Sequence, residues 1–382
     1  MKIEQRKWTH GEGRFPDGPS SFLKESAQLV LVFGATSLLK DDGHFHRIRK
    51  AYPGADVIGC STAGEVCGLR VFDDSLVTTA VHFDAAKVSV AATEITNKEN
   101  SFDVGKELAR SVEHEGLVHV FVVSDGLNVN GSALVKGLSS CLPEGVTISG
   151  GLAGDGERFA ETLVVGNGPP AGNTVAVAAF YGERLRVCCC SFGGWDPFGP
   201  ERLVTRSREN VLYELDGKSA LEIYKQYLGD YARGLPATAL LFPLCVRFEK
   251  DEKGLVRTIL RIDEDEKSMI FAGDIPKGAY ARFMKANVNR LVDGAAKAAK
   301  SCLCTDRCHD QGPDLAVLIS CVGRKMVLKQ RVEEEIESVH EILGPRTAFA
   351  GFYSYGEIAP PFPGEKSELH NQTMTITTFL EK

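Results

Sequence analysis

The sequence predicts an α/β fold of mixed α+β type, in which stacked mixed β-sheets are flanked by helices. Short, wholly apolar runs such as Leu29–Gly34 are typical of strands buried on both faces. A helical stretch that ends at Pro or Gly follows each run, and then a second strand enters a glycine turn. Because this order recurs three times, we predict internal strand–helix–strand repeats with parallel pairing and right-handed crossovers.

The three copies have similar lengths from the first strand to the glycine of the second; they cover residues 33–59, 123–150 and 320–351. Helices are expected from about His44, from about Ser132 and over Val332–Leu343. Strands of antiparallel character follow each copy, so we expect mixed sheets with helices packed outside. Residues 282–300 are rich in alanine and apolar on one side, and they predict a further helix.

The length of 382 residues favours two domains. Residues 1–28 are expected to form a loose lead-in. Residues 193–200 (GGWDPFGP) are rich in Gly and Pro and indicate a boundary. We therefore expect an N-terminal domain at 29–205 and a C-terminal domain at 206–382.

The composition, with 43% apolar and 25% charged residues, is that of a globular protein. A net charge of -7 argues against nucleic acid as a partner, because phosphate binding needs a basic face. The N-terminus lacks the apolar run of a signal peptide, and no stretch approaches the ~20 apolar residues of a membrane helix. We therefore expect a cytoplasmic protein whose eleven cysteines are thiols or metal ligands. The oligomeric state is left open.

The glycine turns that end the three copies are the first candidate site; they cover residues 59–65, 150–155 and 351–357. Such turns present backbone N–H groups to a ligand, and they also allow strands to cross in tight contact. Both interpretations stay open. Cys60 in the first turn would be the nucleophile of a thiol enzyme, but no partner base stands at a recognisable spacing. A small buried residue is the favoured interpretation of Cys60.

A Cys/His cluster is the second candidate. Three thiols and an imidazole fall within eight residues and suit tetrahedral zinc or a redox role; they are Cys302, Cys304, Cys308 and His309. The spacing matches no standard zinc finger, and free surface thiols are the alternative. The separate run 188–190 (CCC) is interpreted as buried small residues of a strand.

His370 is the third candidate. It stands beside Asn371 and Gln372, just before a strand, and would ligate haem iron or hold a polar ligand. The spacing alone favours a structural role in capping the turn. Arg324 is a bidentate donor that would bind a carboxylate or phosphate ligand, or one of the acidic residues within 333–337.

Several motifs resemble the signatures of FIST proteins, a family with paired N-terminal and C-terminal FIST regions; they are GCSTAGEV at 59–66, SDGLNVNG at 124–131, SGGLAGDG at 149–156, SCVGRK at 320–325, GFYSYGEIAP at 351–360 and ELHNQT at 368–373. The resemblance covers nearly the whole chain. It implies a sensory, ligand-binding module of signal transduction, for which amino acids are proposed ligands. Some stand-alone members are haem proteins that sense nitric oxide and regulate histidine kinases or cyclic-di-GMP enzymes. This chain is similar to that stand-alone type.

The resemblance implies a ligand site made of residues near the C-terminus, namely Gly351, Tyr353, Tyr355, Gly356, Glu357, His370, Asn371 and Gln372. The Cys/His segment departs from the family pattern and adds a metal or redox input. We therefore expect a cytoplasmic sensor read out by a signalling partner. Haem for nitric oxide sensing, a zinc or thiol redox centre and an amino-acid-type ligand are the open inputs. A Cys60-dependent enzyme is the remaining alternative, and no convincing catalytic constellation supports it.

Overall fold

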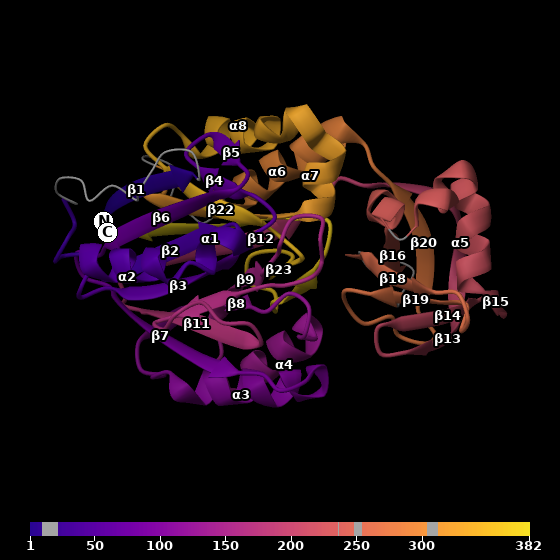
Figure 1. Cartoon of the computed structure of the whole chain (residues 1–382), viewed down its shortest axis with the longest axis horizontal. Helices are drawn as coiled ribbons and strands as arrows, with labels where there is room; N and C mark the ends of the chain where they lie inside the picture. Colours follow the sequence, from indigo (N-terminus) through magenta and orange to yellow (C-terminus); the bar gives the residue numbers. More distant parts are fainter. Residues whose placement is uncertain (10–21, 236, 248–253, 304–311) are drawn as a thin grey trace.

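The computed structural model describes residues 1–9, 22–235, 237–247, 254–303 and 312–382. The chain forms a large body and a smaller lobe, which two connections join (Figure 1). In the large body three sheets each carry one copy of the repeat, with helices on their outer faces. The predicted mixed α/β class with stacked mixed sheets and internal repeats is confirmed. Within the described ranges, no helix is long and apolar enough to cross a membrane.

The three sheets of the large body are given in strand order. The first consists of β1 (Lys2–Thr9), β6 (Ser75–His82), β2 (Leu29–Gly34), β3 (Asp56–Ser61) and β10 (Val164–Gly166). The second consists of β24 (Glu368–His370), β23 (Gly356–Ala359), β9 (Thr147–Leu152), β8 (Leu117–Ser124), β11 (Thr174–Tyr181) and β7 (Lys87–Glu94). The third consists of β12 (Leu185–Phe192), β25 (Met374–Glu381), β21 (Leu315–Cys321), β22 (Ala348–Ser354), β4 (Glu65–Cys67) and β5 (Arg70–Phe72).

Each sheet contains one parallel pair, as predicted: β2 with β3, β8 with β9, and β21 with β22. The crossovers hold the helices α1 (Thr36–Leu39), α2 (Asp42–Ala51), α4 (Gly131–Cys141), α7 (Val322–Leu328) and α8 (Val332–Leu343). Two helices that precede the central strands, α3 (Ser101–Ser111) and α6 (Val288–Leu303), pack beside α4 and α8. The strands β2 and β21 are buried along their whole length, which explains their continuous apolar sequences.

The three units exchange strands around a closed ring. From each glycine turn the chain crosses to a neighbouring unit, so that β10 pairs with β3, β4 with β22, and β23 with β9. Equivalent backbone hydrogen bonds join the turns; they run from Ala63 N to Tyr353 O (2.8 Å), from Gly154 N to Ser61 O (2.9 Å) and from Tyr355 N to Leu152 O (3.2 Å). The repeat is therefore a ring of three mutually dependent units, since each sheet needs a strand from another unit.

The glycine turns owe their sequence to this packing. A Cβ atom on Gly59, Gly150 or Gly351 would lie 1.8 to 1.9 Å from a carbonyl oxygen of the neighbouring parallel strand. No side chain fits at that distance, so glycine is required where the paired strands lie closest. Of the two interpretations of these turns, tight strand packing accounts for the glycines themselves.

The smaller lobe is an insertion between β12 and α6. Its strands are β13 (Asp196–Arg208), β14 (Val211–Leu215), β15 (Lys218–Ser219), β16 (Leu244–Arg247), β17 (Leu255–Arg257), β18 (Ile259–Asp263), β19 (Ser268–Phe271) and β20 (Tyr280–Lys285), and its helix is α5 (Ala220–Leu228). A separate apolar core of the lobe includes Leu212, Tyr224 and Phe283. The domain boundary expected at residue 205 falls inside β13, and the lobe lies between two elements of the third unit.

Two local expectations are corrected. Residues 282–285 belong to β20 rather than to the helix expected over 282–300, because buried Ala281 and Phe283 alternate with exposed neighbours at the strand period. Helix α6 begins only at Val288. In the expected lead-in, β1 pairs with β6 along its whole length and Trp8 is buried. This segment is therefore part of the first sheet.

Candidate functional site

Arg324 is fully buried and holds an ion pair inside the third unit. Its guanidinium donates to Glu335 Oε2 from Nη2 (2.7 Å) and Nε (3.1 Å), and to the Leu291 carbonyl from Nη2 (2.8 Å). Glu335 Oε1 accepts from the Tyr353 hydroxyl (2.6 Å) and from Ser320 Oγ (3.0 Å). Burial and the Glu335 carboxylate hold the pKa of Tyr353 well above its usual range. Arg324 thus binds an acidic residue of the 333–337 segment, and this network ties α7, α8, β21 and β22 together.

Glu357 is a buried carboxylate with a counterpart in the first unit. Its Oε1 accepts from Ser354 Oγ (2.6 Å), and its Oε2 accepts from Thr373 Oγ1 (2.9 Å) and the Thr373 backbone N–H (3.1 Å). Glu65 is held in the same way by Thr62 and Ser75. Burial raises the pKa of each carboxyl to about 7. The repetition indicates that Glu357 stabilises the turn between two strands and is not special to the third copy.

The His370–Gln372 triplet is buried between the large body and the lobe. His370 Nε2 lies 2.9 Å from the Ala359 carbonyl, and burial lowers the pKa of this histidine to about 4. The backbone carbonyl of Gln372 accepts from the Trp195 indole (2.7 Å), and the side-chain Nε2 of Gln372 donates to the Leu240 carbonyl of the lobe (3.2 Å). Asn371 is fully buried, and its amide has no hydrogen-bond partner within the described part of the chain.

Haem does not fit His370 in this structure. The ring nitrogen Nε2 is already hydrogen-bonded to a carbonyl oxygen, and the side chain is only 5% exposed. His370 lines neither of the two cavities between the body and the lobe. An axial role would require the ring to leave its hydrogen bond and the surrounding strands to open. His370 as a haem ligand stays a prediction.

The thiol candidates are also interior or not described. Cys60 is fully buried, and burial together with Glu65 raises its pKa well above the usual range, which disfavours the thiolate that a nucleophile requires. Cys302 is buried in α6 with its sulfur 3.4 Å from Cys190 Sγ. Cys304, Cys308 and His309 lie outside the described residues. Among the residues that are described, no group of three His, Cys, Asp or Glu could hold a metal ion.

Tyr355 is the expected site residue that lines a cavity between the body and the lobe, among those that the structure describes. Its hydroxyl donates a hydrogen bond to the Asp155 carboxylate and accepts one from the Asp155 backbone N–H (3.1 Å). Its ring stacks on Phe159 with the centroids 4.2 Å apart. Together with Leu152 it lines a cavity of about 420 Å³ whose far wall is formed by the lobe, including Asn210 and Phe271.

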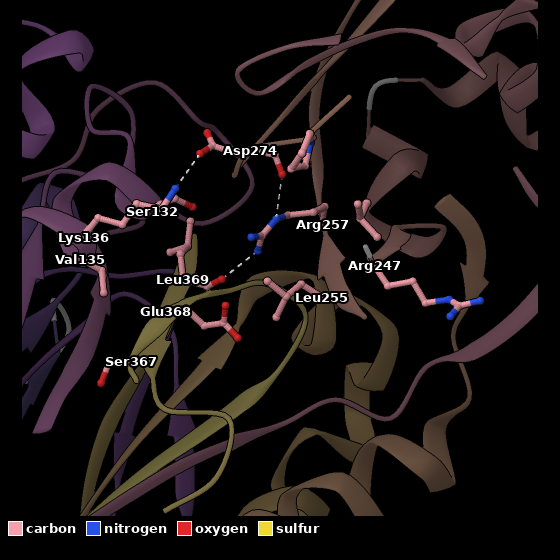
Figure 2. Close-up of a pocket in the computed structure, with 12 residues that line it drawn as sticks. Ser132, Val135, Lys136, Arg247, Leu255, Arg257, Asp274, Ser367, Glu368 and Leu369 are labelled. Atoms are coloured by element: carbon pink, nitrogen blue, oxygen red, sulfur yellow. Dashed lines mark hydrogen bonds and ion pairs between the residues drawn. The ribbon is translucent and has the colours of Figure 1, made fainter. Parts of the chain in front are cut away.

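A second cavity, of about 310 Å³, lies between the body and the lobe (Figure 2). The body contributes α4 and the 367–369 segment, and the lobe contributes β16, β17 and the 274–276 segment. Asp274 lines both cavities. Its carboxylate lies 3.6 Å from Lys136 Nζ and accepts from Asn130 Nδ2 at 3.3 Å, so it also joins the lobe to the start of α4. We call these two adjoining cavities the cleft.

Arg257 is a buried charged group of the cleft wall. The side chain is 6% exposed, and it donates to the Leu369 carbonyl from Nη1 (2.8 Å) and to the Asp274 carbonyl from Nε (3.3 Å) (Figure 2). Burial lowers the pKa of this guanidinium, and the nearby Glu368 and Asp274 carboxylates partly offset that effect. The guanidinium stays charged at neutral pH. Its direct hydrogen bonds go to carbonyl oxygens, and the Glu368 and Asp274 carboxylates act on it from nearby.

Sequence reasoning did not identify Arg257 or Asp274. Both belong to the inserted lobe, where short strands follow one another without a recognisable motif, and Leu369, a hydrogen-bond partner of Arg257, lies 112 residues from it. Arg257 ends the short strand Leu255–Arg257, and a charged residue after two apolar ones is a weak signal because most such residues face solvent.

Comparison with known families decides the affiliation. A FIST N domain model matches residues 28–218, and a FIST C domain model matches residues 220–360. The chain belongs to the FIST family. FIST domains are generally sensory, ligand-binding domains of signal transduction. The haem-binding type remains a proposal.

Two individual proteins are similar to this FIST chain. Uncharacterized protein MJ1623 of Methanocaldococcus jannaschii is 25% identical over an alignment of 359 residues, which covers 86% of this chain; the chain spans 65% of the length of that relative. A crystal structure of cyanuric acid hydrolase from A. caulinodans aligns over 93% of this chain and 90% of that one, with a TM-score of 0.38 and 6% identity. A similarity of that size gives no information about activity.

Proposed function

We propose that this FIST protein is a sensor that binds a small carboxylate-bearing ligand in the cleft between the large body and the lobe. The observation that supports it is Arg257, a buried guanidinium on the cleft wall whose hydrogen bonds to described residues go to carbonyl oxygens. A planar guanidinium binds a carboxylate through two parallel hydrogen bonds, and such bonds are stronger in a desolvated site. Binding would give Arg257 a carboxylate in direct contact, which it does not have among the described residues.

An amino-acid-type ligand matches the remaining chemistry of the smaller cavity. Asp274 and Glu368 lie near Arg257 and would accept from an ammonium group, while Val135, Leu255 and Leu369 offer apolar contact. Arg247 pairs with Glu201, and its side chain extends away from Arg257 (Figure 2). The cavity volume of about 310 Å³ is at the small end of ligand pockets, which favours a compact molecule.

The two-body arrangement would convert binding into a signal. Ligand atoms held by α4 on one side and by β17 on the other would bias the position of the lobe relative to the body. A cytoplasmic signalling partner, such as a histidine kinase or a cyclic-di-GMP enzyme, would then detect the lobe position. The nature of this partner follows from the family resemblance.

Isothermal titration calorimetry with a panel of free amino acids tests the proposal, using the full chain. We expect at least one to bind, and Arg257→Met to weaken that binding more than tenfold, because a charge-assisted bidentate contact is removed. Arg261→Met is the matched control, since Arg261 is an exposed arginine of the same lobe. Equal affinity in the two variants, or no binding by any amino acid, would contradict the proposal.

The haem and zinc hypotheses are tested on the same purified protein. Protein produced with haem available should show a Soret band if haem is the input, and His370→Ala should shift it if His370 is the axial ligand. Metal analysis of the reduced protein, with Cys304→Ser and Cys308→Ser as variants, decides zinc. A colourless, metal-free protein that binds an amino acid leaves the cleft as the sensory site.

A further inference from the structure

Three cysteine thiols meet inside the large body, where α6 packs on β12. Cys188 and Cys190 lie on the same face of β12 because strand residues alternate, and Cys302 lies in the last turn of α6. The sulfur atoms of Cys190 and Cys302 are 3.4 Å apart, and both side chains are fully buried. All three cysteines are free thiols.

The surrounding atoms fix the two closest thiols in facing positions. Cys190 Sγ lies 3.0 Å from the Ala298 carbonyl of α6, and Cys302 Sγ lies 3.5 Å from the Ile376 carbonyl of β25. Each sulfur is thus anchored to the element opposite its own strand or helix. A disulfide needs the sulfurs at about 2.0 Å, and small side-chain rotations close the remaining gap.

We propose that Cys190 and Cys302 form a redox site, which a hydroperoxide converts into a disulfide. Cys188 is the least buried of the three, and its hydrogen bond with Cys302 lowers its pKa, so its sulfur attacks one peroxide oxygen; the O–O bond breaks, and a sulfenic acid and water result. The Cys302 sulfur then attacks the sulfenic sulfur, the S–O bond breaks, and a second water leaves with the thiol proton. The Cys190 sulfur finally attacks Cys302 in this disulfide, and Cys188 leaves as a thiol with the Cys190 proton. Two thiols and one hydrogen peroxide yield one disulfide and two waters.

The location gives this disulfide a structural consequence. Strand β12 leads directly into the lobe, and α6 is the first element after the lobe. A disulfide between Cys190 and Cys302 would therefore join the two segments that hold the lobe. These segments already touch closely near the lobe, where a Cβ on Gly294 would lie 1.7 Å from the Gly193 carbonyl. A covalent bond between them would fix the base of the lobe, independently of any ligand in the cleft. Cys188 is 7% exposed and lies on the same face, where peroxide would enter.

Peptide mapping by mass spectrometry tests the inference. The reduced full chain is exposed to hydrogen peroxide, remaining thiols are alkylated, and the protein is digested without reductant. We expect a peptide pair linked through Cys190 and Cys302 to increase at least tenfold, and to disappear after treatment with dithiothreitol. Cys190→Ala and Cys302→Ala should each lose this pair, whereas Cys60→Ala, which removes another buried thiol, should retain it.

Two results would overturn the inference. One is a disulfide that joins Cys302 to Cys304 or Cys308 in place of Cys190. The other is the absence of any 190–302 link at peroxide concentrations that oxidise the half-buried thiols Cys67 and Cys141. The mapping of the wild-type chain decides between these outcomes by itself, so the inference stays testable if an alanine variant fails to fold.

Discussion

Two buried arginines of this FIST protein have different partners, and the difference separates a structural charge from the one at the proposed ligand site. Arg324 in the body and Arg257 in the lobe are both almost fully removed from solvent. Arg324 forms two hydrogen bonds to the Glu335 carboxylate. Arg257 donates to the carbonyl oxygens of Asp274 and Leu369. Arg324 therefore has a carboxylate in direct contact, whereas Arg257, at a cavity wall, contacts neutral oxygens, and this contrast underlies the proposed ligand site.

Arg324 lies in a recognisable sequence motif, whereas Arg257 does not. Arg324 stands among the residues that carry the family resemblance, and the polar groups around it are hydrogen-bonded to one another: Glu335 accepts from Arg324, Tyr353 and Ser320. Density of polar residues in a motif therefore indicates structure here as readily as it indicates ligand binding. The following variants test that distinction.

The largest effect is expected from Arg324→Met. This variant leaves the Glu335 carboxylate buried without its cation, and we expect the free energy of unfolding to fall by about 3–5 kcal/mol. Denaturant unfolding followed by circular dichroism measures it. Arg331→Met is the control, because Arg331 pairs with Glu334 at the surface, where loss of an ion pair costs at most about 1 kcal/mol. Similar losses in both variants would refute the structural role of Arg324.

The second effect concerns the buried carboxyl of Glu357. Its pKa of about 7 in the folded chain exceeds the ordinary value of 4.5, so between these values the folded state binds more protons than the unfolded state. Stability therefore falls as pH rises, by up to about 1.4 kcal/mol per pH unit. We expect Glu357→Gln to gain stability relative to the wild type between pH 5 and pH 7. Unfolding curves at several pH values measure this difference, and a constant difference would contradict the assignment.

The third test is the stability of Arg257→Met without ligand. Arg257 has no direct contact with a carboxylate in the described part of the chain, so the variant leaves none unpaired. The loss of its hydrogen bonds is offset because a charge no longer has to be buried, and we expect the free energy of unfolding to change by less than about 1 kcal/mol. The same denaturant titration as for Arg324→Met makes the comparison direct. A loss as large as that of Arg324→Met would show that Arg257 is a structural residue and would weaken the proposed ligand site.

The smallest effect is expected where the lobe meets the body. Asp274→Asn removes the charge that lies 3.6 Å from Lys136, and a double-mutant cycle with Lys136→Gln should give a coupling of about 0.5 kcal/mol, since Lys136 is largely exposed. A coupling above about 2 kcal/mol would mean that this contact locks the cleft closed. A ligand that competes for Asp274 should reduce the coupling further.

Several features followed from local sequence alone. Continuous apolar runs identified β2, β8 and β21 because a strand covered on both faces has no polar side. The helix over Val332–Leu343 was placed at its observed bounds because its apolar spacing and the following Gly-Pro stop are both local. The glycines of the three turns were recognised by their recurrence, and the family by its motifs.

Only the tertiary structure decided how these parts meet. The choice of Glu335 as the partner of Arg324, the exchange of β4, β10 and β23 among the units, and the insertion of the lobe inside the third unit depend on contacts between distant residues. The cleft is the clearest case, because it lies between α4 and strands more than 100 residues further along the chain. Periodicity reports which face of an element is buried, but not against which element it is buried, so the proposed ligand site could be found only from the folded chain.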